Sequence, residues 1–206
     1  MTNNRATVAR ANPTGPTLID ETEQILAGLT APQKELSPKY LYDATGSKLF
    51  DEICELPEYY LTRTERWIME RYLGEMASLI GPRVSVIEFG SGSSTKIRLL
   101  LDNLIKPAAY VPVDISADYL SSMADELARD YPGVQIRPVF ADFTQPFELP
   151  DHPVSPARNL IFFPGSTIGN FDRQNALSLL KVMRLEAKTG GAVLIGVDLK
   201  KDPRMI

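Results

Sequence analysis

The chain has very little of the side chains that hold metals or build nucleophile–base pairs. It contains one cysteine, Cys54, and one histidine, His152, among 206 residues. One cysteine cannot close an internal disulfide, and neither residue alone can build a zinc site. His152 lies in a proline-rich stretch, which does not suit a Ser-His-Asp triad. We therefore expect no metal site, and a cytoplasmic protein in a reducing compartment.

Long apolar runs and an excess of basic charge are also scarce. No apolar run approaches the ~20 residues that a membrane-spanning helix needs, and the N-terminal MTNNRATVARANPTG lacks a signal-peptide core. The 22 Lys and Arg against 26 Asp and Glu give a net charge of −4, whereas nucleic-acid-binding domains usually concentrate basic residues on one face. The sequence predicts a soluble protein that binds neither membranes nor nucleic acid.

What is present divides into three predicted parts. Residues 1–17 are polar and contain proline and glycine, which predicts a flexible tail. Residues 18–80 show helical spacing and predict a helical cap. Residues 81–206 alternate short apolar runs with helical stretches, which is typical of an α/β fold with parallel strands and helices on both faces. The sequence thus predicts a Rossmann-like open sheet with an N-terminal helical cap.

The spacing of apolar residues also predicts the individual elements. The cap should contain helices over 18–29 and 62–80, and the second should begin at Thr62 with Glu65 three residues on, as in a capping box. In the α/β part the expected strands are 84–89, 110–113, 134–139, 159–163 and 192–197. The expected helices between them are 94–104, 117–131 and 173–186.

The strongest local motif is VIEFGSGSSTK, residues 86–96. A strand ends near Glu88 and enters a turn with Gly90 and Gly92, followed by a helix, as in nucleotide-binding sites. A dinucleotide fingerprint needs a third glycine where this chain has Thr95. A carboxylate at the mouth of the turn would repel a pyrophosphate and suits the positive sulfonium and amino groups of S-adenosylmethionine. A purely structural glycine turn is the alternative.

Two further acids follow the next two strands. Asp114 could accept from both hydroxyls of a ribose, or it could cap the next helix in competition with Ser116. Asp142 could accept from an adenine amino group while Phe143 lines the ring, although Asp-Phe in a loop is also an ordinary turn. Acids at the ends of three parallel strands predict a ligand site along one edge of the sheet.

A polar loop, FPGSTIGN, follows the fourth predicted strand. Gly165 and Gly169 bracket it, and Asn170 can both donate and accept hydrogen bonds. The alternative role of Asn170 is to cap the helix that begins near Asp172. Aromatic residues also gather in the cap, and composition alone favours core packing for them. They are Tyr42, Phe50, Tyr59 and Tyr60.

Together these stretches resemble a known family. The segments concerned are YLYDATGSKLFDEICELPEYYLTRTE (40–65), IEFGSGSSTKIRLLLD (87–102), PVDIS (112–116), ADF (141–143), FPGSTIGN (163–170) and GVDLKKD (196–202). They look like the histidine-specific S-adenosylmethionine-dependent methyltransferases, which in ergothioneine biosynthesis methylate the α-amine of L-histidine to trimethylhistidine. The first and fifth stretches are specific to that family, whereas the glycine turn is shared with many methyltransferases.

The resemblance implies roles for individual residues. It assigns S-adenosylmethionine binding to Gly90, Lys96, Asp114, Asp142 and Phe143, with Glu88 and Gly92 of the same turn. It assigns contacts with the amino-acid substrate to Tyr42, Phe50, Tyr59, Gly165 and Asn170. In this family the asparagine holds the substrate's carboxylate, and the tyrosine matching Tyr59 helps to recognise the imidazole.

The C-terminal end departs from the family pattern. Family members continue well beyond GVDLKKD, so we expect a truncated domain whose last apolar strand is an exposed edge that favours self-association or a complementing chain. Two interpretations follow: an amino-acid N-methyltransferase, or a cofactor-binding module that is inactive alone or completed by another chain. A nicotinamide oxidoreductase is disfavoured by Thr95 and Glu88.

Overall fold

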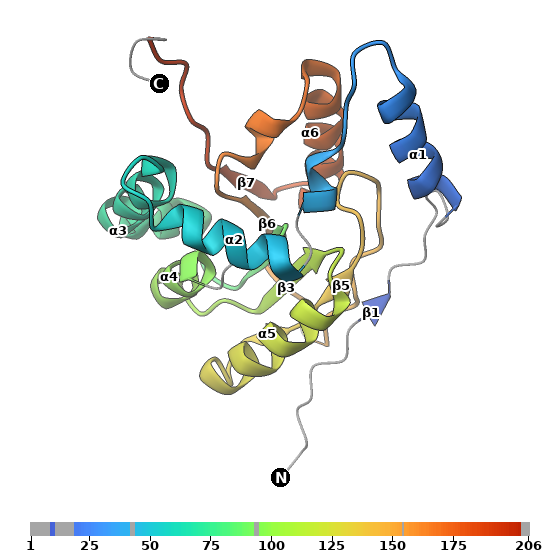
Figure 1. The fold of residues 1–206 in the computed structure, drawn as a ribbon. Helices are drawn as coiled ribbons and strands as arrows, with labels where there is room; N and C mark the ends of the chain where they lie inside the picture. Colours follow the sequence, from blue (N-terminus) through green and yellow to red (C-terminus); the bar gives the residue numbers. More distant parts are fainter. Residues whose placement is uncertain (1–8, 11–18, 42–43, 93–94, 154, 203–206) are drawn as a thin grey trace.

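A seven-stranded parallel sheet forms the centre of the molecule (Figure 1). The computed structural model describes residues 9–10, 19–41, 44–92, 95–153 and 155–202. Neighbouring strands are hydrogen bonded in the order β1-β5-β3-β2-β6-β7, with β4 beside β3. The strands are β1 (Ala9–Arg10), β2 (Val84–Phe89), β3 (Ala109–Asp114), β4 (Gln135–Ile136), β5 (Val139–Phe140), β6 (Arg158–Phe163) and β7 (Ala192–Ile195).

The central strand β2 sets the position of the later loops. All six of its residues are buried, as expected for a strand covered on both faces. Its register pairs Glu88 with Pro112 of β3 and with Phe162 of β6. Because the three strands are parallel and end at similar levels, the loops that follow them leave from the same edge of the sheet.

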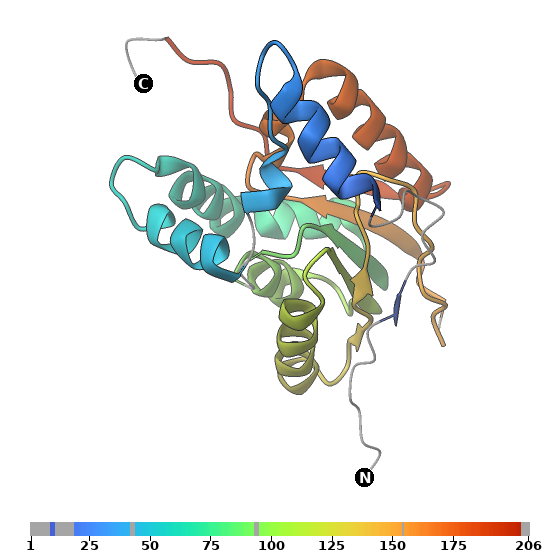
Figure 2. The ribbon, with the colours of Figure 1, turned by 45° about the vertical axis from the view of Figure 1, so that its right-hand side comes forward.

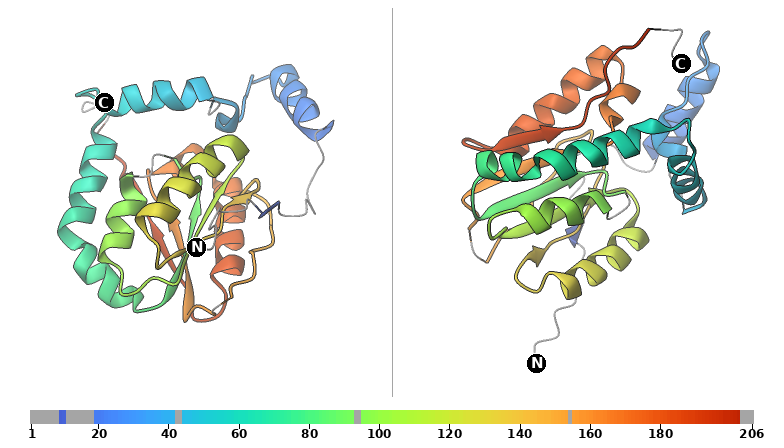
Figure 3. Two further views of the ribbon diagram at one scale, coloured as in Figure 1. Left: turned by 90° about the horizontal axis from the view of Figure 1, so that it is seen from below. Right: turned by 90° about the vertical axis from the view of Figure 1, so that its left-hand side faces the viewer.

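Helices cover the two faces of the sheet unequally (Figure 3). One core cluster joins the sheet to α3, α4 and α5, and it includes Leu73, Leu100 and Leu127 from these helices. A second cluster joins the opposite face to α6, where Leu179 and Met183 are buried. The helices are α1 (Ile19–Thr30), α2 (Ala44–Cys54), α3 (Tyr60–Ile80), α4 (Thr95–Asn103), α5 (Ala117–Asp130) and α6 (Arg173–Ala187), with 3-10 turns η1 (Pro38–Leu41) and η2 (Thr167–Asn170).

The helices α1 and α2 stand outside these layers (Figure 2). Their apolar residues stay largely exposed, with Leu26 56% and Leu49 53% accessible. The amphipathic spacing therefore predicted α1 correctly, but the apolar faces of both helices have little to pack against. By contrast α3 is part of the main core. The predicted boundary between a helical cap and an α/β domain at residues 80 and 81 therefore stays a prediction from the sequence.

Two sequence predictions were wrong in detail. The helix α3 begins at Tyr60, so Thr62 lies within its first turn; the Thr62 hydroxyl donates to Cys54 Sγ at 3.3 Å. The residue at the N-cap position, Tyr59, makes no side-chain capping bond. The predicted strand 134–139 is divided into β4 and β5, because Pro138 lacks the N–H that a continuous ladder would need.

The ends of the sheet are formed by short strands. Of the predicted tail 1–17, the structure describes Ala9–Arg10, which pair with β5 as β1. At the other end β7 pairs with β6 and stops at Ile195, two residues before the predicted end. Within the described residues no helix has the length and apolarity to cross a membrane.

Candidate functional site

The glycine turn after β2 has a backbone that requires glycine. Gly90 has φ = +74°, and its N–H donates to the Val113 carbonyl at 2.9 Å. A Cβ at this position would lie 3.3 Å from Phe143 Cε1. The turn is thus closed by β3 on one side and by the Phe143 ring on the other, which brings three of the predicted cofactor segments together.

Glu88 is buried at the end of β2, with 3% of its surface exposed. The Tyr110 hydroxyl donates to its Oε2 at 2.5 Å. Burial raises the pKa of Glu88 from 4.5 to about 8, while Tyr110 and the positive charge of Lys96 act in the opposite direction. The carboxyl is therefore mostly neutral at pH 7, and a cationic group placed beside it would favour its charged form.

Asp114 lies against the same turn. Its Oδ1 accepts from the Ser116 N–H at 3.0 Å. Burial raises its pKa, and the backbone N–H groups of Ser116, Ile115 and Ser91 oppose that rise by stabilising the carboxylate. Because Ser116 occupies the N-cap position of α5, the helix-capping alternative for Asp114 was wrong.

The turn contains a buried hydroxyl, that of Ser91. The Ser91 side chain is 1% exposed, and its hydroxyl has no hydrogen-bond partner among the residues that the structure describes. Buried polar groups are nearly always paired, and exceptions often mark the place of a ligand or water. The turn therefore fits a ligand that carries hydroxyl or amino groups.

The segment after β5 forms a tight turn beside the glycine turn. Asp142 Oδ1 accepts from the Thr144 N–H at 2.9 Å and from the Thr144 hydroxyl at 2.6 Å. The Phe143 ring packs against Phe89 and Phe163, with ring centroids 5.7 and 5.8 Å apart. Asp142 thus stabilises a turn, which was the alternative role that the sequence left open. Its contact with an adenine amino group stays a prediction.

The loop after β6 leaves from the same edge. Its first residues, Gly165 and Ser166, have φ of +82° and +56°, and η2 follows with Asn170 exposed at its end. Asp172 caps α6 by accepting from the Asn175 N–H at 2.8 Å. The capping alternative for Asn170 was therefore wrong, and its amide is available for another partner.

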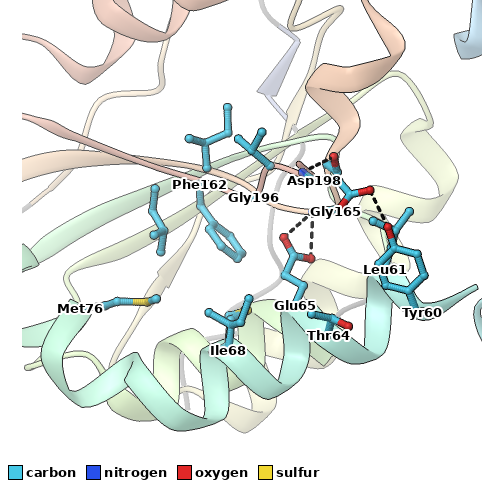
Figure 4. Close-up of a pocket in the computed structure, with 15 residues that line it drawn as sticks. Tyr60, Leu61, Thr64, Glu65, Ile68, Met76, Phe162, Gly165, Gly196 and Asp198 are labelled. Carbon is cyan, nitrogen blue, oxygen red and sulfur yellow. Dashed lines mark hydrogen bonds between the residues drawn. The ribbon is translucent and has the colours of Figure 1, made fainter. Parts of the chain in front are cut away.

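Glu65 joins this loop to the cofactor side, a role that sequence reasoning missed. The two oxygens of its carboxylate lie 2.8 and 2.9 Å from the Gly165 N, which donates to them (Figure 4). Lys96 Nζ donates to Glu65 Oε2 at 2.5 Å, and both side chains are 17% exposed. Spacing could not reveal these contacts, because the partners lie 31 and 100 residues away.

A cavity of about 300 Å³ opens between α3 and the ends of β6 and β7. At its polar end the Tyr60 hydroxyl donates to Asp198 Oδ2 at 2.7 Å (Figure 4), and the Asp198 N–H donates to Ser166 Oγ at 2.8 Å. Lys201 Nζ donates to Asp198 Oδ1 and lies 4.8 Å from the centroid of the Tyr60 ring. The cavity is lined by Tyr60, Leu61, Thr64, Glu65, Ile68, Met69, Met76, Phe162, Gly165, Ser166, Leu194, Ile195, Gly196, Val197 and Asp198.

Two of the predicted aromatic substrate contacts pack on each other. Phe50 of α2 and Tyr59 make an edge-to-face pair with ring centroids 5.8 Å apart. This agrees with the packing role that composition favoured, while their contact with a substrate stays a prediction. Tyr42 lies outside the described residues.

The rare residues of the chain lie elsewhere. His152 Nε2 is 3.3 Å from Ser85 Oγ near the start of β2, at the opposite edge of the sheet. Within the described residues, no group of three or more His, Cys, Asp or Glu side chains could hold a metal ion.

Comparison with known proteins finds relatives that include N-methyltransferases. The histidine N-alpha-methyltransferase of Mycolicibacterium smegmatis is 39% identical over 181 residues, which are 86% of this chain and 55% of the relative. Ergothioneine biosynthesis protein 1 of Neurospora crassa is 32% identical over 177 residues, covering 84% of this chain and 20% of the relative. The 4-dimethylallyltryptophan N-methyltransferase of Claviceps purpurea is 30% identical over 199 residues, covering 89% and 57%.

The chain spans about half the length of the bacterial relative that it matches. Among solved structures, the plantazolicin methyltransferase BpumL in complex with SAH is 16% identical, covers 81% of this chain and 54% of that chain, and has a TM-score of 0.43. A family model described as histidine-specific methyltransferase, SAM-dependent, matches residues 21–206. The chain belongs to this family of histidine-specific, S-adenosylmethionine-dependent methyltransferases.

Proposed function

We propose that this chain binds S-adenosylmethionine at the carboxyl edge of the sheet and directs its methyl group to the α-amine of L-histidine. The observation that carries the proposal is the junction between the glycine turn and the Gly165–Asn170 loop. Glu65 and Lys96 connect the two at hydrogen-bonding distance. A cofactor in the turn and an amino acid on the loop would then lie side by side.

The cofactor half fits a ligand with positive charge and hydroxyl groups. In this proposal the ribose hydroxyls donate to Asp114, and the adenine ring lies by Asp142 and Phe143. The Ser91 hydroxyl gains the partner that it lacks among the described residues. Lys96 attracts the ligand's carboxylate, and Glu88 becomes charged beside its cationic groups.

The substrate half supplies polar and aromatic groups from two directions. The Asn170 amide donates to the carboxylate of the amino acid, and the loop that contains Gly165 lines the position where the amino acid binds. Tyr42, Phe50 and Tyr59 are assigned to contacts with the amino acid, and Tyr59 helps to recognise its imidazole. The same proposal places the reaction in the cytoplasm, where a chain with Cys54 as its one cysteine needs no disulfide.

In this reaction the protein mainly orients the two reactants and excludes water from them. When bound, S-adenosylmethionine supplies a methyl carbon activated by its sulfonium. A tyrosine hydroxyl or an ordered water would relay to solvent the proton that the substrate's amine must lose. The chain's residues hold the neutral amine in line with the methyl carbon.

The test is methyl transfer by the purified chain. Labelled S-adenosylmethionine and histidine should yield labelled methylhistidine, detected by mass spectrometry. Tryptophan is the matched comparator, because the Claviceps purpurea relative is named for a tryptophan derivative. Faster methylation of tryptophan than of histidine would contradict the proposed substrate.

The edge strand β7 supports a second candidate, a cofactor-binding module that needs another chain. In the described structure β7 pairs with β6 alone, and Val193 is 44% exposed. Open sheet edges readily pair with further strands. Binding of S-adenosylhomocysteine without turnover, together with turnover after a complementing chain is added, would favour this candidate. A chain that binds no S-adenosylhomocysteine would contradict both candidates.

A further inference from the structure

Glu65 is enclosed at a junction of four segments. It projects from α3 toward the ends of β6 and β7 (Figure 4), and Lys96 reaches it from α4. A Cβ on Gly196 would overlap the Glu65 carboxylate, so the absence of a side chain at 196 makes room for it. The position of the carboxylate is therefore fixed from several sides.

The partners of Glu65 explain why a carboxylate stands here. The Gly165 N–H and the Lys96 ammonium are both donors, and they converge on one group. A carboxylate only accepts, so it can satisfy both at once. The amide of a glutamine would turn its NH₂ toward one of these donors.

The two partners belong to different halves of the proposed site. Lys96 follows the glycine turn and is assigned to the cofactor, whereas Gly165 opens the loop that ends at Asn170. Positions 165 and 96 are also close to each other, since a Cβ on Gly165 would lie 3.5 Å from Lys96 Nζ. A shift of the Glu65 carboxylate would therefore move both Lys96 in the cofactor half and the Gly165 loop in the substrate half.

We propose that Glu65 is a positioning residue that couples cofactor binding to substrate binding by holding Lys96 and the Gly165 loop on one carboxylate. This inference rests on the proposed function and deepens it. Glu65 acts through its two partners rather than on the reacting atoms. Removing one member of a partly buried ion pair leaves the other charge uncompensated, so the effect reaches both sites.

The main experiment is a double-mutant cycle read by calorimetry with S-adenosylhomocysteine, which requires no turnover. We expect Glu65→Gln and Lys96→Met each to weaken binding by about tenfold. The double variant should bind no more weakly than either single variant, because Glu65 reaches the cofactor through Lys96. Losses that multiply would overturn the proposal.

The substrate side is read by titrating histidine into the chain saturated with S-adenosylhomocysteine. Glu65→Gln should weaken histidine binding by about fivefold, as the loop loses its anchor. Glu70→Gln is the matched control on the same helix, because Glu70 pairs with Arg66 on the exposed face and should change neither affinity. Unchanged affinities in a folded Glu65→Gln variant would overturn the proposal.

A second measurement needs only the wild-type chain. The Gly165 amide should exchange slowly with solvent, and its NMR resonance should shift when S-adenosylhomocysteine binds. Fast exchange and an unmoved resonance would contradict the coupling. If the wild-type chain does not bind S-adenosylhomocysteine, the proposed function fails; if it binds and the variants behave as wild type, only the role of Glu65 fails.

Discussion

The two halves of the candidate site are built in different ways. The cofactor half is a set of turns at the ends of neighbouring strands, and its contacts are largely local, as between Asp114 and Ser116 or between Asp142 and Thr144. The loop proposed for the substrate half is held by groups from distant segments: the Asp198 N–H donates to Ser166 of this loop, and Tyr60 donates to Asp198. Local turns therefore contribute more to the first half, although Tyr110 and Phe143 also hold it across strands, and contacts between distant segments dominate the second. Changes to single residues should therefore affect the halves separately, except at the Glu65 junction.

The largest expected effect is that of Gly90→Val in the cofactor half. The positive φ and the nearby Phe143 ring leave no room for a branched side chain. A left-handed conformation costs an L-residue ~1–2 kcal/mol before any clash is counted. We expect a loss of ~2–4 kcal/mol in the free energy of unfolding, from the strain and the displaced ring together.

Chemical denaturation measures the free energy, and calorimetry with S-adenosylhomocysteine should show lost binding. The control for stability is Gly92→Ala, because a Cβ at Gly92 meets no described residue within 4 Å. Wild-type stability in Gly90→Val would show that the turn tolerates a side chain and is not locally fixed.

The two halves should also respond oppositely to pH. The raised pKa of Glu88, about 8, means that the folded chain binds a proton between pH 4.5 and 8 that the unfolded chain releases. The stability from this group is complete below pH 4.5 and is lost as pH rises toward 8. Glu88→Gln should flatten that fall, as measured by urea denaturation across pH 5 to 8.

Asp198 provides the contrast. Hydrogen bonds from Lys201 and Tyr60 lower its pKa, so its contribution is present above its ordinary pKa and is lost as pH falls through the lowered value. Asp198→Asn should lower stability at neutral pH and flatten the loss of stability on the acid side, where the wild-type carboxylate becomes protonated. A Glu88→Gln variant with the wild-type slope between pH 5 and 8 would contradict the burial argument.

Asn170→Ala tests the substrate half alone. Asn170 is exposed and does not cap α6, so the variant should fold normally. We expect histidine binding to weaken by about tenfold, because a hydrogen bond to a charged group contributes roughly 1.5–3 kcal/mol. S-adenosylhomocysteine binding should be unchanged. Calorimetry that finds unchanged histidine affinity would reject the assignment.

The smallest expected effect is that of Tyr60→Phe. The change removes the hydrogen bond to Asp198 and keeps the ring beside Lys201. A loss of ~1 kcal/mol in stability is expected, with a few-fold weaker histidine affinity and unchanged cofactor affinity. Thermal unfolding and calorimetry measure the three quantities. An effect on cofactor affinity alone would contradict the assignment of the Tyr60–Asp198 contact to the substrate half.

The difference between the halves also explains what the sequence could predict. Strands β2 and β3 are buried and largely apolar runs, and Glu88 and Asp114 lie at their carboxyl ends in the expected order. The break at Pro138 was missed because Ile136 and Val139 continue the apolar pattern on either side of it. Where a residue lies within a strand depends on its neighbours in the sequence, so the local pattern of apolar residues predicts it well.

Glu65 shows why the remaining contacts of the site could not be predicted from the sequence. Its spacing from Thr62 fits a capping box, and α3 simply begins two residues earlier than that pattern requires. Its real partners are Lys96 and Gly165, and only the folded sheet brings them together. Tyr60 and Asp198 are 138 residues apart and pose the same difficulty. Such contacts depend on packing geometry that no short window contains.

The close fit between Gly196 and Glu65 has a consequence for how the sequence can change over evolution. A side chain at 196 would take the space of the Glu65 carboxylate. Positions 65 and 196 should therefore vary together among related chains. A lineage that gains a side chain at 196 must first shorten residue 65, and it would then need another acceptor for Lys96.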